Sequence, residues 1–213
     1  MKRAPFITFE GGEGTGKSTQ IRRLQEALLI QQIQVETFRE PGGTTGAEAI
    51  RKLLVEGDPD RWDGMTEALL MYAARRDLTQ KRIIPTLAKG IWGLCDRFFD
   101  STMAYQGFGH ELGYETVREL NHAVMGDFVP DLTFVFNLGS GIGLQRAANR
   151  GGIEDRFERK GLTFHERVDE GYAEIVKRNP ERCVVIDAFQ DIHQVFYDIA
   201  QVIEKRFGVK IPC

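Results

Sequence analysis

The stretch FEGGEGTGKST, residues 9–19, limits the possible folds of this chain more than any other segment. It contains the pattern G-x-x-x-x-G-K-S between Gly11 and Ser18, directly after an apolar run and directly before a helical pattern. Successive backbone N–H groups can wrap a polyphosphate only where no Cβ intrudes and positive φ is allowed, which explains the glycines. The segment therefore predicts a strand, a phosphate-binding loop and a helix whose N-terminus faces a nucleoside triphosphate.

The side chains of this loop have distinct expected roles in binding ATP or GTP. Lys17 would neutralise the β- and γ-phosphates, and the Ser18 hydroxyl would ligate Mg²⁺. Glu13 would repel a triphosphate, so its carboxylate either points toward a second ligand or a cationic side chain, or is simply solvated. The residues expected to bind the nucleotide are Gly11, Gly12, Glu13, Gly14, Thr15, Gly16, Lys17, Ser18 and Thr19.

Short β-type runs alternate with helical patterns along the rest of the chain. The predicted strands are residues 6–10, 34–38, 90–95, 132–138 and 183–187. The predicted helices are residues 17–31, 46–55, 66–88, 114–125, 142–149, 163–177 and 192–207. This alternation predicts a three-layer α/β fold, in which a five-stranded parallel sheet carries helices on both faces. Ligands of such sheets bind beyond the carboxyl ends of the strands.

Composition restricts the class of protein. With 213 residues, 42% of them hydrophobic and 28% charged, the chain is expected to form one globular domain, residues 1–213. The net charge of −3 argues against nucleic acid or a membrane as a general partner. Cys95, Cys183 and Cys213 lack metal-ligand spacing and are expected to be reduced thiols. No apolar run reaches the length of a membrane span, so we expect a cytoplasmic protein.

Several cationic positions follow the predicted strands or lie on a predicted helix. Arg39 and Arg51 flank REPGGTTGAEAIR, and each either contacts a ligand or faces solvent. Met71 and Arg75 are four residues apart on a helix and share a face. An apolar side chain beside an arginine suits a base and its phosphate, although core packing plus a surface charge is the alternative.

The segment CDRFFDSTMAYQG carries the strongest signs of a second ligand. Asp96 and Arg97 lie at the end of a predicted buried strand, where charges are costly unless they are used, so we expect contacts to magnesium-bound water and to phosphate. Thr102, Tyr105 and Gln106 could hydrogen-bond to a base edge and wall off its sugar.

The charged stretch RGGIEDRFERKG, residues 150–161, predicts a mobile loop between two helices. Arg146 and Arg150 share a helix face, and Arg156 follows them. A mobile arginine that closes over a transferring phosphoryl group stabilises its charge and excludes water. We therefore expect a lid over residues 146–161, with a solvated charged loop as the alternative.

Together these motifs resemble those of one family. FEGGEGTGKST, REPGGT, LLMYAAR, CDRFFDSTMAYQG, PDLTFVF and DRFE occur in the order and at the spacing of thymidylate kinases (dTMP kinases), which are nucleoside monophosphate kinases. The resemblance covers nearly the whole chain. It implies a P-loop NTPase fold with a mobile lid, transfer of the γ-phosphoryl group of Mg·ATP to dTMP, and a homodimer.

The resemblance also implies roles for residues at matching positions. Glu13 takes the place of a loop acid that contacts the 3′-hydroxyl of the acceptor sugar, Arg75 and Arg97 match arginines that hold the dTMP phosphate, and Asp96 matches an acid near the metal. The thymine edge would be read, and a ribose 2′-hydroxyl disfavoured, by Thr102, Tyr105 and Gln106. The residues implied for dTMP are Glu13, Arg39, Pro41, Met71, Arg75, Arg97, Thr102, Tyr105 and Gln106.

The implied catalytic cations resemble those of the bacterial type. Family members without an arginine in the phosphate loop keep catalytic arginines in the lid, and residues 12–15 of this loop contain none. The residues implied for catalysis are Lys17, Arg97, Arg146, Arg150 and Arg156. Those implied for Mg²⁺ are Ser18 and Asp96.

Two departures from the family pattern leave alternatives open. Met71 stands where a phenylalanine usually stacks on thymine, so the contact is weaker or is made up by Tyr72 or Phe38. Asn137 stands where the strand often ends in aspartate. The alternative functions are a monophosphate kinase for dUMP, CMP or GMP, and a P-loop regulatory ATPase, which would leave the acceptor motifs without a use.

Overall fold

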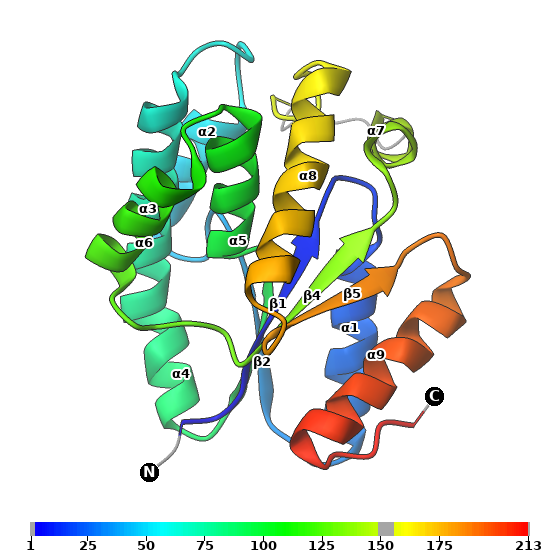
Figure 1. Ribbon diagram of the computed structural model, residues 1–213. Coiled ribbons are helices and arrows are strands. Elements are labelled where there is room, and N and C mark those ends of the chain that lie inside the picture. Colours follow the sequence, from blue (N-terminus) through cyan, green and yellow to red (C-terminus); the bar gives the residue numbers. More distant parts are fainter. Residues whose placement is uncertain (1–2, 149–155, 213) are drawn as a thin grey trace.

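A computed structural model describes residues 3–148 and 156–212 of the protein (Figure 1). Its five strands are all parallel and form one sheet in the order β2-β3-β1-β4-β5. The strands are β1 (Phe6–Gly11), β2 (Val35–Arg39), β3 (Trp92–Asp96), β4 (Leu132–Asn137) and β5 (Cys183–Asp187). The predicted α/β fold with a five-stranded parallel sheet is confirmed, and each predicted strand is present within two residues of its expected ends.

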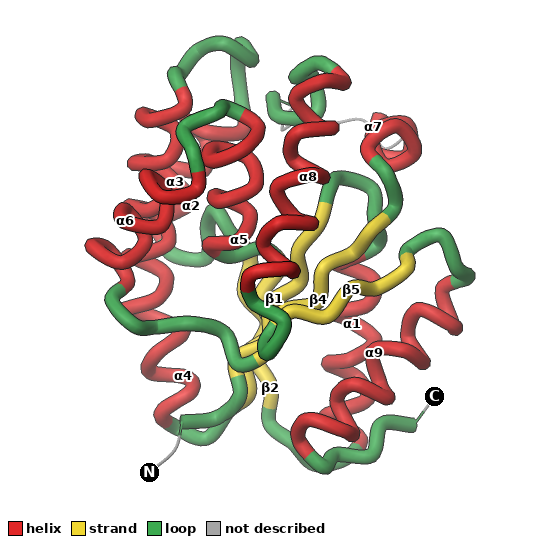
Figure 2. Tube along the Cα trace, viewed as in Figure 1, coloured by secondary structure: helices red, strands yellow, loops and turns green. Residues whose placement is uncertain are grey.

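Helices cover both faces of this sheet (Figure 2). The helical segments are α1 (Lys17–Ile30), α2 (Thr45–Val55), α3 (Gly64–Leu78), η1 (Thr79–Ile83), α4 (Ile84–Ala88), α5 (Phe99–Thr102), η2 (Met103–Gly109), α6 (Tyr114–Met125), α7 (Ser140–Ala148), α8 (Leu162–Arg178) and α9 (Ile192–Phe207). Over the described ranges no helix combines the length and the apolar character that a membrane span requires.

The central strand β1 shows how side chains are divided between the two faces. All of its residues are buried, because β3 pairs with one edge, β4 with the other, and helices cover both faces. Ile7 and Phe9 pack in the core shared with α1 and α9. Successive side chains of a strand point to opposite faces, so Thr8 and Glu10 face the side covered by α5 and α8. A buried carboxyl group therefore lies beneath the carboxyl edge of the sheet.

Two helical predictions differ from the structure. The predicted helix 66–88 is divided by η1, a π-helical stretch that precedes Pro85, whose missing N–H prevents a regular turn at that point. No helix was predicted over residues 99–109, yet α5 and η2 occupy them. A Cβ on Gly109 would lie 2.7 Å from the Phe164 ring. Packing against α8 therefore selects glycine there.

Helix α7 contacts the phosphate loop backbone to backbone. A Cβ on Gly14 would lie 2.3 Å from the carbonyl oxygen of Gly143, and a Cβ on Gly143 would lie 2.5 Å from that of Glu13. Both positions therefore require glycine for steric reasons, and Gly14 also has a positive φ of 69°. This contact brings Arg146 beside the loop, with its Cβ 2.9 Å from the position that a Cβ on Gly14 would take.

We expect Gly143→Ala to disturb the phosphate loop. The added methyl group would force the Glu13 carbonyl to move, lowering the free energy of unfolding by about 1–3 kcal/mol and raising the KM for ATP. Gly141→Ala on the same helix is the matched control, because nothing lies within 4 Å of its Cβ position. It should be neutral or stabilising by up to about 1 kcal/mol. Urea unfolding and steady-state kinetics would measure both, and equal behaviour of the two variants would contradict the contact.

Candidate active site

The phosphate loop connects β1 to α1 and borders a cavity of about 190 Å³. Lys17 donates to the carbonyl oxygens of Gly11 at 3.0 Å and Gly12 at 2.6 Å, and to Thr15 Oγ1 at 3.2 Å. Burial, together with the charge of Arg97, lowers the pKa of Lys17 to about 8. Carbonyl oxygens of the loop thus hold the ammonium group beside the cavity. A phosphate chain bound in this cavity would contact the N–H groups of the loop.

Ser18 and Asp96 meet at the edge of this cavity. The Ser18 hydroxyl donates to Asp96 Oδ2 at 2.7 Å, and both residues line the cavity. Hydroxyl and carboxylate oxygens suit Mg²⁺, which usually keeps several waters and binds one or two protein oxygens plus substrate phosphates. Within residues 3–148 and 156–212 no three His, Cys, Asp or Glu side chains gather into a metal site. The pair fits a magnesium ion held mainly by nucleotide and water.

Arg97 forms a shared wall between the phosphate-loop cavity and a second cavity. Its guanidinium donates to Gly11 O at 2.9 Å, Glu13 Oε1 at 3.1 Å and the Tyr105 hydroxyl at 3.3 Å. The Tyr105 hydroxyl in turn donates to Glu13 Oε1 at 2.6 Å. Burial alone would raise the pKa of Glu13, but Arg97, Tyr105 and Lys17 outweigh burial and lower it. The Glu13 carboxylate thus points toward a cationic side chain, one of the alternatives that its sequence position left open.

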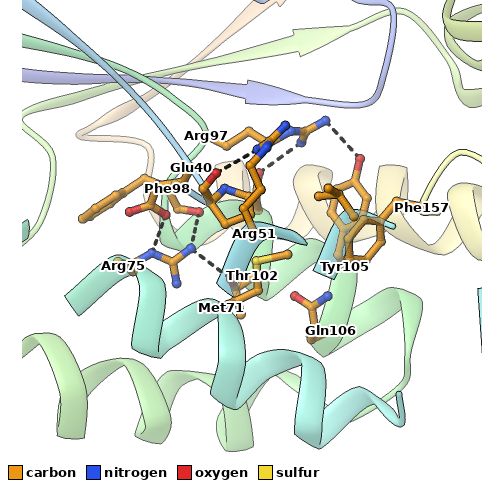
Figure 3. A pocket seen from close by; sticks show the side chains of 13 residues that line it. Glu40, Arg51, Met71, Arg75, Arg97, Phe98, Thr102, Tyr105, Gln106 and Phe157 are labelled. Atoms are coloured by element: carbon orange, nitrogen blue, oxygen red, sulfur yellow. Dashed lines mark hydrogen bonds and ion pairs between the residues drawn. The ribbon is translucent and has the colours of Figure 1, made fainter. Parts of the chain in front are cut away.

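The second cavity has a volume of about 130 Å³ and lies between α3, α5 and the loop after β2 (Figure 3). Seven residues expected to bind an acceptor line it, namely Pro41, Met71, Arg75, Arg97, Thr102, Tyr105 and Gln106. Arg39 does not line it, because its exposed side chain pairs with Glu48 at 2.8 Å. Glu13 lines the adjoining phosphate-loop cavity instead.

The sequence analysis did not assign several of the residues that line this cavity. Arg51 lines the cavity, where its Nη1 donates to Pro41 O at 2.8 Å, whereas the sequence left open whether it faced solvent. Phe157 also lines the cavity, edge-on to Tyr105 at 5.8 Å between ring centroids. Neither Tyr72 nor Phe38 does so, and both are buried. The aromatic side chains that line the cavity with Met71 are therefore Phe98, Tyr105 and Phe157, and the DRFE motif was the available signal for Phe157.

Arg75 is buried at the α3 side of this cavity. Its Nε donates to Glu40 Oε2 at 2.7 Å, and its Nη2 donates to Phe98 O at 3.1 Å and Thr102 Oγ1 at 3.0 Å. Burial raises the pKa of Glu40 to about 7, even though Arg75 opposes the shift. Nη1 of Arg75 is buried and has no hydrogen-bond partner in the described part of the chain. A charge already paired with a carboxyl group, with only the N–H groups of Nη1 left over, suits a neutral carbonyl better than the acceptor phosphate expected from the sequence.

The three expected lid arginines differ in their placement. Arg146 is exposed on α7 beside the phosphate loop, and Arg150 lies outside the described residues. Arg156 is fully buried and differs from the expectation of a catalytic lid residue. Its Nη2 donates to Glu67 Oε1 at 2.6 Å, and its guanidinium also donates to the carbonyl oxygens of Leu54 in α2 and of Asp58 and Pro59 in the loop after α2. A catalytic contact would require it to leave all of these partners.

A buried polar cluster supports Arg97 from below. Glu10 accepts hydrogen bonds from the Phe98 N–H at 2.7 Å, the Ser101 hydroxyl at 2.6 Å and the Tyr172 hydroxyl at 3.3 Å. Burial and the nearby Asp100 raise the pKa of Glu10 to about 8. The sequence signal for this cluster was a carboxyl group at the end of a buried strand, next to the first glycine of the loop.

Known proteins resemble this chain over nearly its whole length. A family model described as thymidylate kinase matches residues 9–199. The chain is 53% identical over 209 residues to the thymidylate kinase of Caulobacter vibrioides, covering 98% of this chain and 100% of that protein. It is 45% identical over 212 residues to that of Afipia carboxidovorans, covering 99% and 93%. The crystal structure of thymidylate kinase from Ehrlichia chaffeensis matches with a TM-score of 0.76 at 34% identity, covering 95% of this chain and 99% of that chain.

We expect Glu10→Gln to reduce the pH dependence of stability. With a pKa of about 8 in the folded protein against an ordinary 4.5, Glu10 keeps its proton where the unfolded chain has lost it. Its contribution to stability is therefore present at low pH and is lost as pH rises from about 4.5 to about 8. The free energy of unfolding should therefore fall less with rising pH in the variant than in the natural protein. The difference should be at least about 1 kcal/mol, since one pKa unit corresponds to about 1.4 kcal/mol.

Urea unfolding at pH 5 and pH 8 would measure the difference. Glu26→Gln, which removes an exposed carboxyl group of α1, should keep the fall that the natural protein shows. Part of the fall should persist in Glu10→Gln, because the pKa of Glu40 is raised by burial as well. An undiminished fall in Glu10→Gln would contradict the assignment.

Proposed function

This chain belongs to the thymidylate kinase family, and from that premise we propose that it transfers the γ-phosphoryl group of Mg·ATP to dTMP, giving ADP and dTDP. The observation that carries the proposal is the position of Arg97, whose side chain lines both the phosphate-loop cavity and the cavity beside Met71. A cation shared by two adjoining cavities can hold an acceptor phosphate next to the end of a donor triphosphate.

On the donor side, the loop would hold ATP through its backbone N–H groups and through Lys17. Ser18 and Asp96 would hold Mg²⁺, which when bound compensates charge on the phosphate oxygens. Lys17 would exchange its contacts with Gly11 and Gly12 for phosphate oxygens. Its pKa of about 8 leaves it mostly protonated at neutral pH, so its charge is available for the transferring group.

On the acceptor side, cations and apolar groups occupy different parts of the cavity. Arg97 and Arg51 would hold the phosphate of dTMP, and Met71 and Phe157 would cover the faces of the base. Arg75 would donate an N–H of Nη1 to a carbonyl of the base. Support for this comes from its ion pair with Glu40, which already compensates its charge.

The transfer itself demands positioning and charge stabilisation more than covalent chemistry. The acceptor is an anionic phosphate, so no general base is needed. Arg146, exposed beside the loop, and Arg150 remain our candidates for stabilising the transferring phosphoryl group. We propose for Arg156 an anchoring role, because its buried contacts hold the end of the segment 146–161 against α2 and α3.

We further propose that the chain is one kinase domain over residues 1–213, with residues 146–161 as its lid, and that it acts as a cytoplasmic homodimer. Buried free thiols at Cys95 and Cys183 agree with a reducing compartment. Exposed leucines on α2 and α3, Leu53 and Leu69, are apolar surface that a partner subunit could cover.

The two alternative functions gain less support. A monophosphate kinase for another base would use the same donor site, but the family comparisons favour dTMP. A regulatory ATPase would leave the cavity at Met71 and the buried Arg75 without a ligand.

The proposal is tested by ADP release from Mg·ATP with dTMP, dUMP, CMP, GMP and AMP as acceptors. We expect ADP release to require an acceptor and to be fastest with dTMP. Release without any acceptor, or equal release with all of them, would overturn the proposal. Lys17→Ala, prepared in parallel, reports on contaminating kinases.

Two substitutions should separate the donor side from the acceptor side. We expect Lys17→Ala to lower kcat by about 10²- to 10³-fold and to change the KM for dTMP by only a few-fold, because its charge acts on the transferring group. Arg75→Met should raise the KM for dTMP about tenfold or more, because it removes a buried donor. The matched control is Arg76→Met, whose exposed guanidinium donates to Val124 O away from the cavity. An unchanged KM in Arg75→Met would contradict its placement.

A further inference from the structure

The donor and acceptor contacts do not use Glu67, a buried carboxylate beside the acceptor cavity. Glu67 of α3 is fully buried, and four polar side chains surround it. We propose that Glu67 is a positioning residue that fixes the amide of Gln106 with its oxygen toward the acceptor cavity, and so makes that cavity selective for a pyrimidine whose ring nitrogen N3 carries a hydrogen. The inference rests on the proposed function and names how its site distinguishes bases.

Glu67 lies on the same helix face as two side chains that line the cavity, Met71 and Arg75. Glu67, Met71 and Arg75 follow one another at four-residue spacing and share one face of α3. Two hydrogen bonds join this face to the segment formed by α5 and η2. Arg75 Nη2 donates to Thr102 Oγ1 at 3.0 Å, and Gln106 Nε2 donates to Glu67 Oε2 at 3.1 Å. Met71 lies between these two contacts and lines the cavity (Figure 3).

The charge of Glu67 decides which way the Gln106 amide turns. Burial alone would raise the pKa of Glu67, but His110 and Arg156 outweigh burial and lower it. An ionised carboxylate only accepts hydrogen bonds, so Gln106 must turn its NH₂ group toward Glu67. The amide oxygen of Gln106 then lies on the side of Met71 (Figure 3). This oxygen is buried, and no donor among the residues described here reaches it.

Among the described residues that line this cavity, Gln106 Oε1, Arg75 Nη1 and Glu40 Oε1 are buried without a hydrogen-bond partner, and the first two are an acceptor and a donor. A base edge with an N–H next to a carbonyl satisfies both. Thymine and uracil present that edge with N3–H and O4, whereas cytosine presents a ring-nitrogen lone pair and an amino group, which is the reverse pattern. A buried polar group left unpaired is costly, so a site built for a hydrogen bond strongly rejects a base that lacks it.

The same carboxylate also holds a wall of the cavity. Its Oε1 accepts from Arg156 at 2.6 Å, and Lys160 Nζ lies 3.7 Å from it. The residue after Arg156 is Phe157, which lines the cavity against Tyr105. One oxygen of Glu67 therefore positions an aromatic wall, and the other positions the amide that reads the base.

Glu67→Gln tests the inference in the full-length protein, with kcat/KM measured for dTMP and dCMP at saturating Mg·ATP. The new amide can donate as well as accept, so Gln106 is free to turn its NH₂ group toward the cavity, where it complements cytosine. We expect kcat/KM for dTMP to fall about tenfold or more, and the ratio of dTMP to dCMP to fall by a similar factor.

A second variant keeps the test valid if Glu67→Gln fails to fold. Gln106→Met preserves side-chain length and removes the acceptor oxygen, so it should lower the same ratio. Asp100→Asn is the matched control, because Asp100 is an equally buried carboxylate that pairs with Arg182 at 2.6 Å and does not line the cavity. It should lower stability and leave the ratio unchanged.

The outcomes separate the inference from the proposed function. A natural protein without dTMP-dependent ADP release would overturn the proposed function. A natural protein that uses dTMP and dCMP equally, or variants at Glu67 and Gln106 that lose both activities in proportion with an unchanged ratio, would overturn the inference and assign Glu67 a structural role only.

Discussion

The hydrogen-bonded position of Arg97 is the interaction on which the rest of the site depends. A guanidinium at the end of a buried strand is costly unless its charge is compensated, and Glu13 together with two tyrosine hydroxyls provides that compensation. Arg97 also takes a positive φ of 67°, which turns the chain from β3 toward the cavities. The glycine loop, the acceptor cavity and the cluster at Glu10 are therefore joined through one side chain.

Three buried carboxyl groups give the acceptor side its rigidity. Glu10 supports the segment after Arg97, Glu40 pairs with Arg75, and Glu67 joins Gln106 to Arg156. Each accepts hydrogen bonds from groups on other elements, so each fixes the distance between parts of the cavity wall. Groups held by packing and by such bonds can meet a substrate without reorganising, which is the requirement of a reaction that depends on positioning.

The sequence predicted the sheet and its carboxyl-edge site, because strand periodicity and the residues after each strand are visible in short segments. It predicted most of the cavity residues through the resemblance of its motifs to those of one family. Its predictions were less accurate where contacts between distant segments decide the direction of a side chain or the presence of a helix. The sequence left open whether Arg39 and Arg51 face solvent, and the resemblance implied Arg39 for dTMP. In the fold Arg51 lines the cavity, and Arg39 pairs with Glu48 instead. The helical segment at 99–109 was missed, and its Gly109 serves a contact with α8 that no local pattern reveals.

The sequence by itself determined the phosphate loop and its chemistry. A cradle of backbone N–H groups requires glycines, a lysine and a hydroxyl at fixed local spacing, and these are visible from Gly11 to Ser18. Only the tertiary structure decided which charges serve the ligand and which serve the fold. Arg156 and Glu67 are 89 positions apart, and their burial in one ion pair depends on how α3 and the segment before α8 pack together. The physical reason is that burial, which sets the cost of each charge, is a property of the assembled fold and not of any short segment.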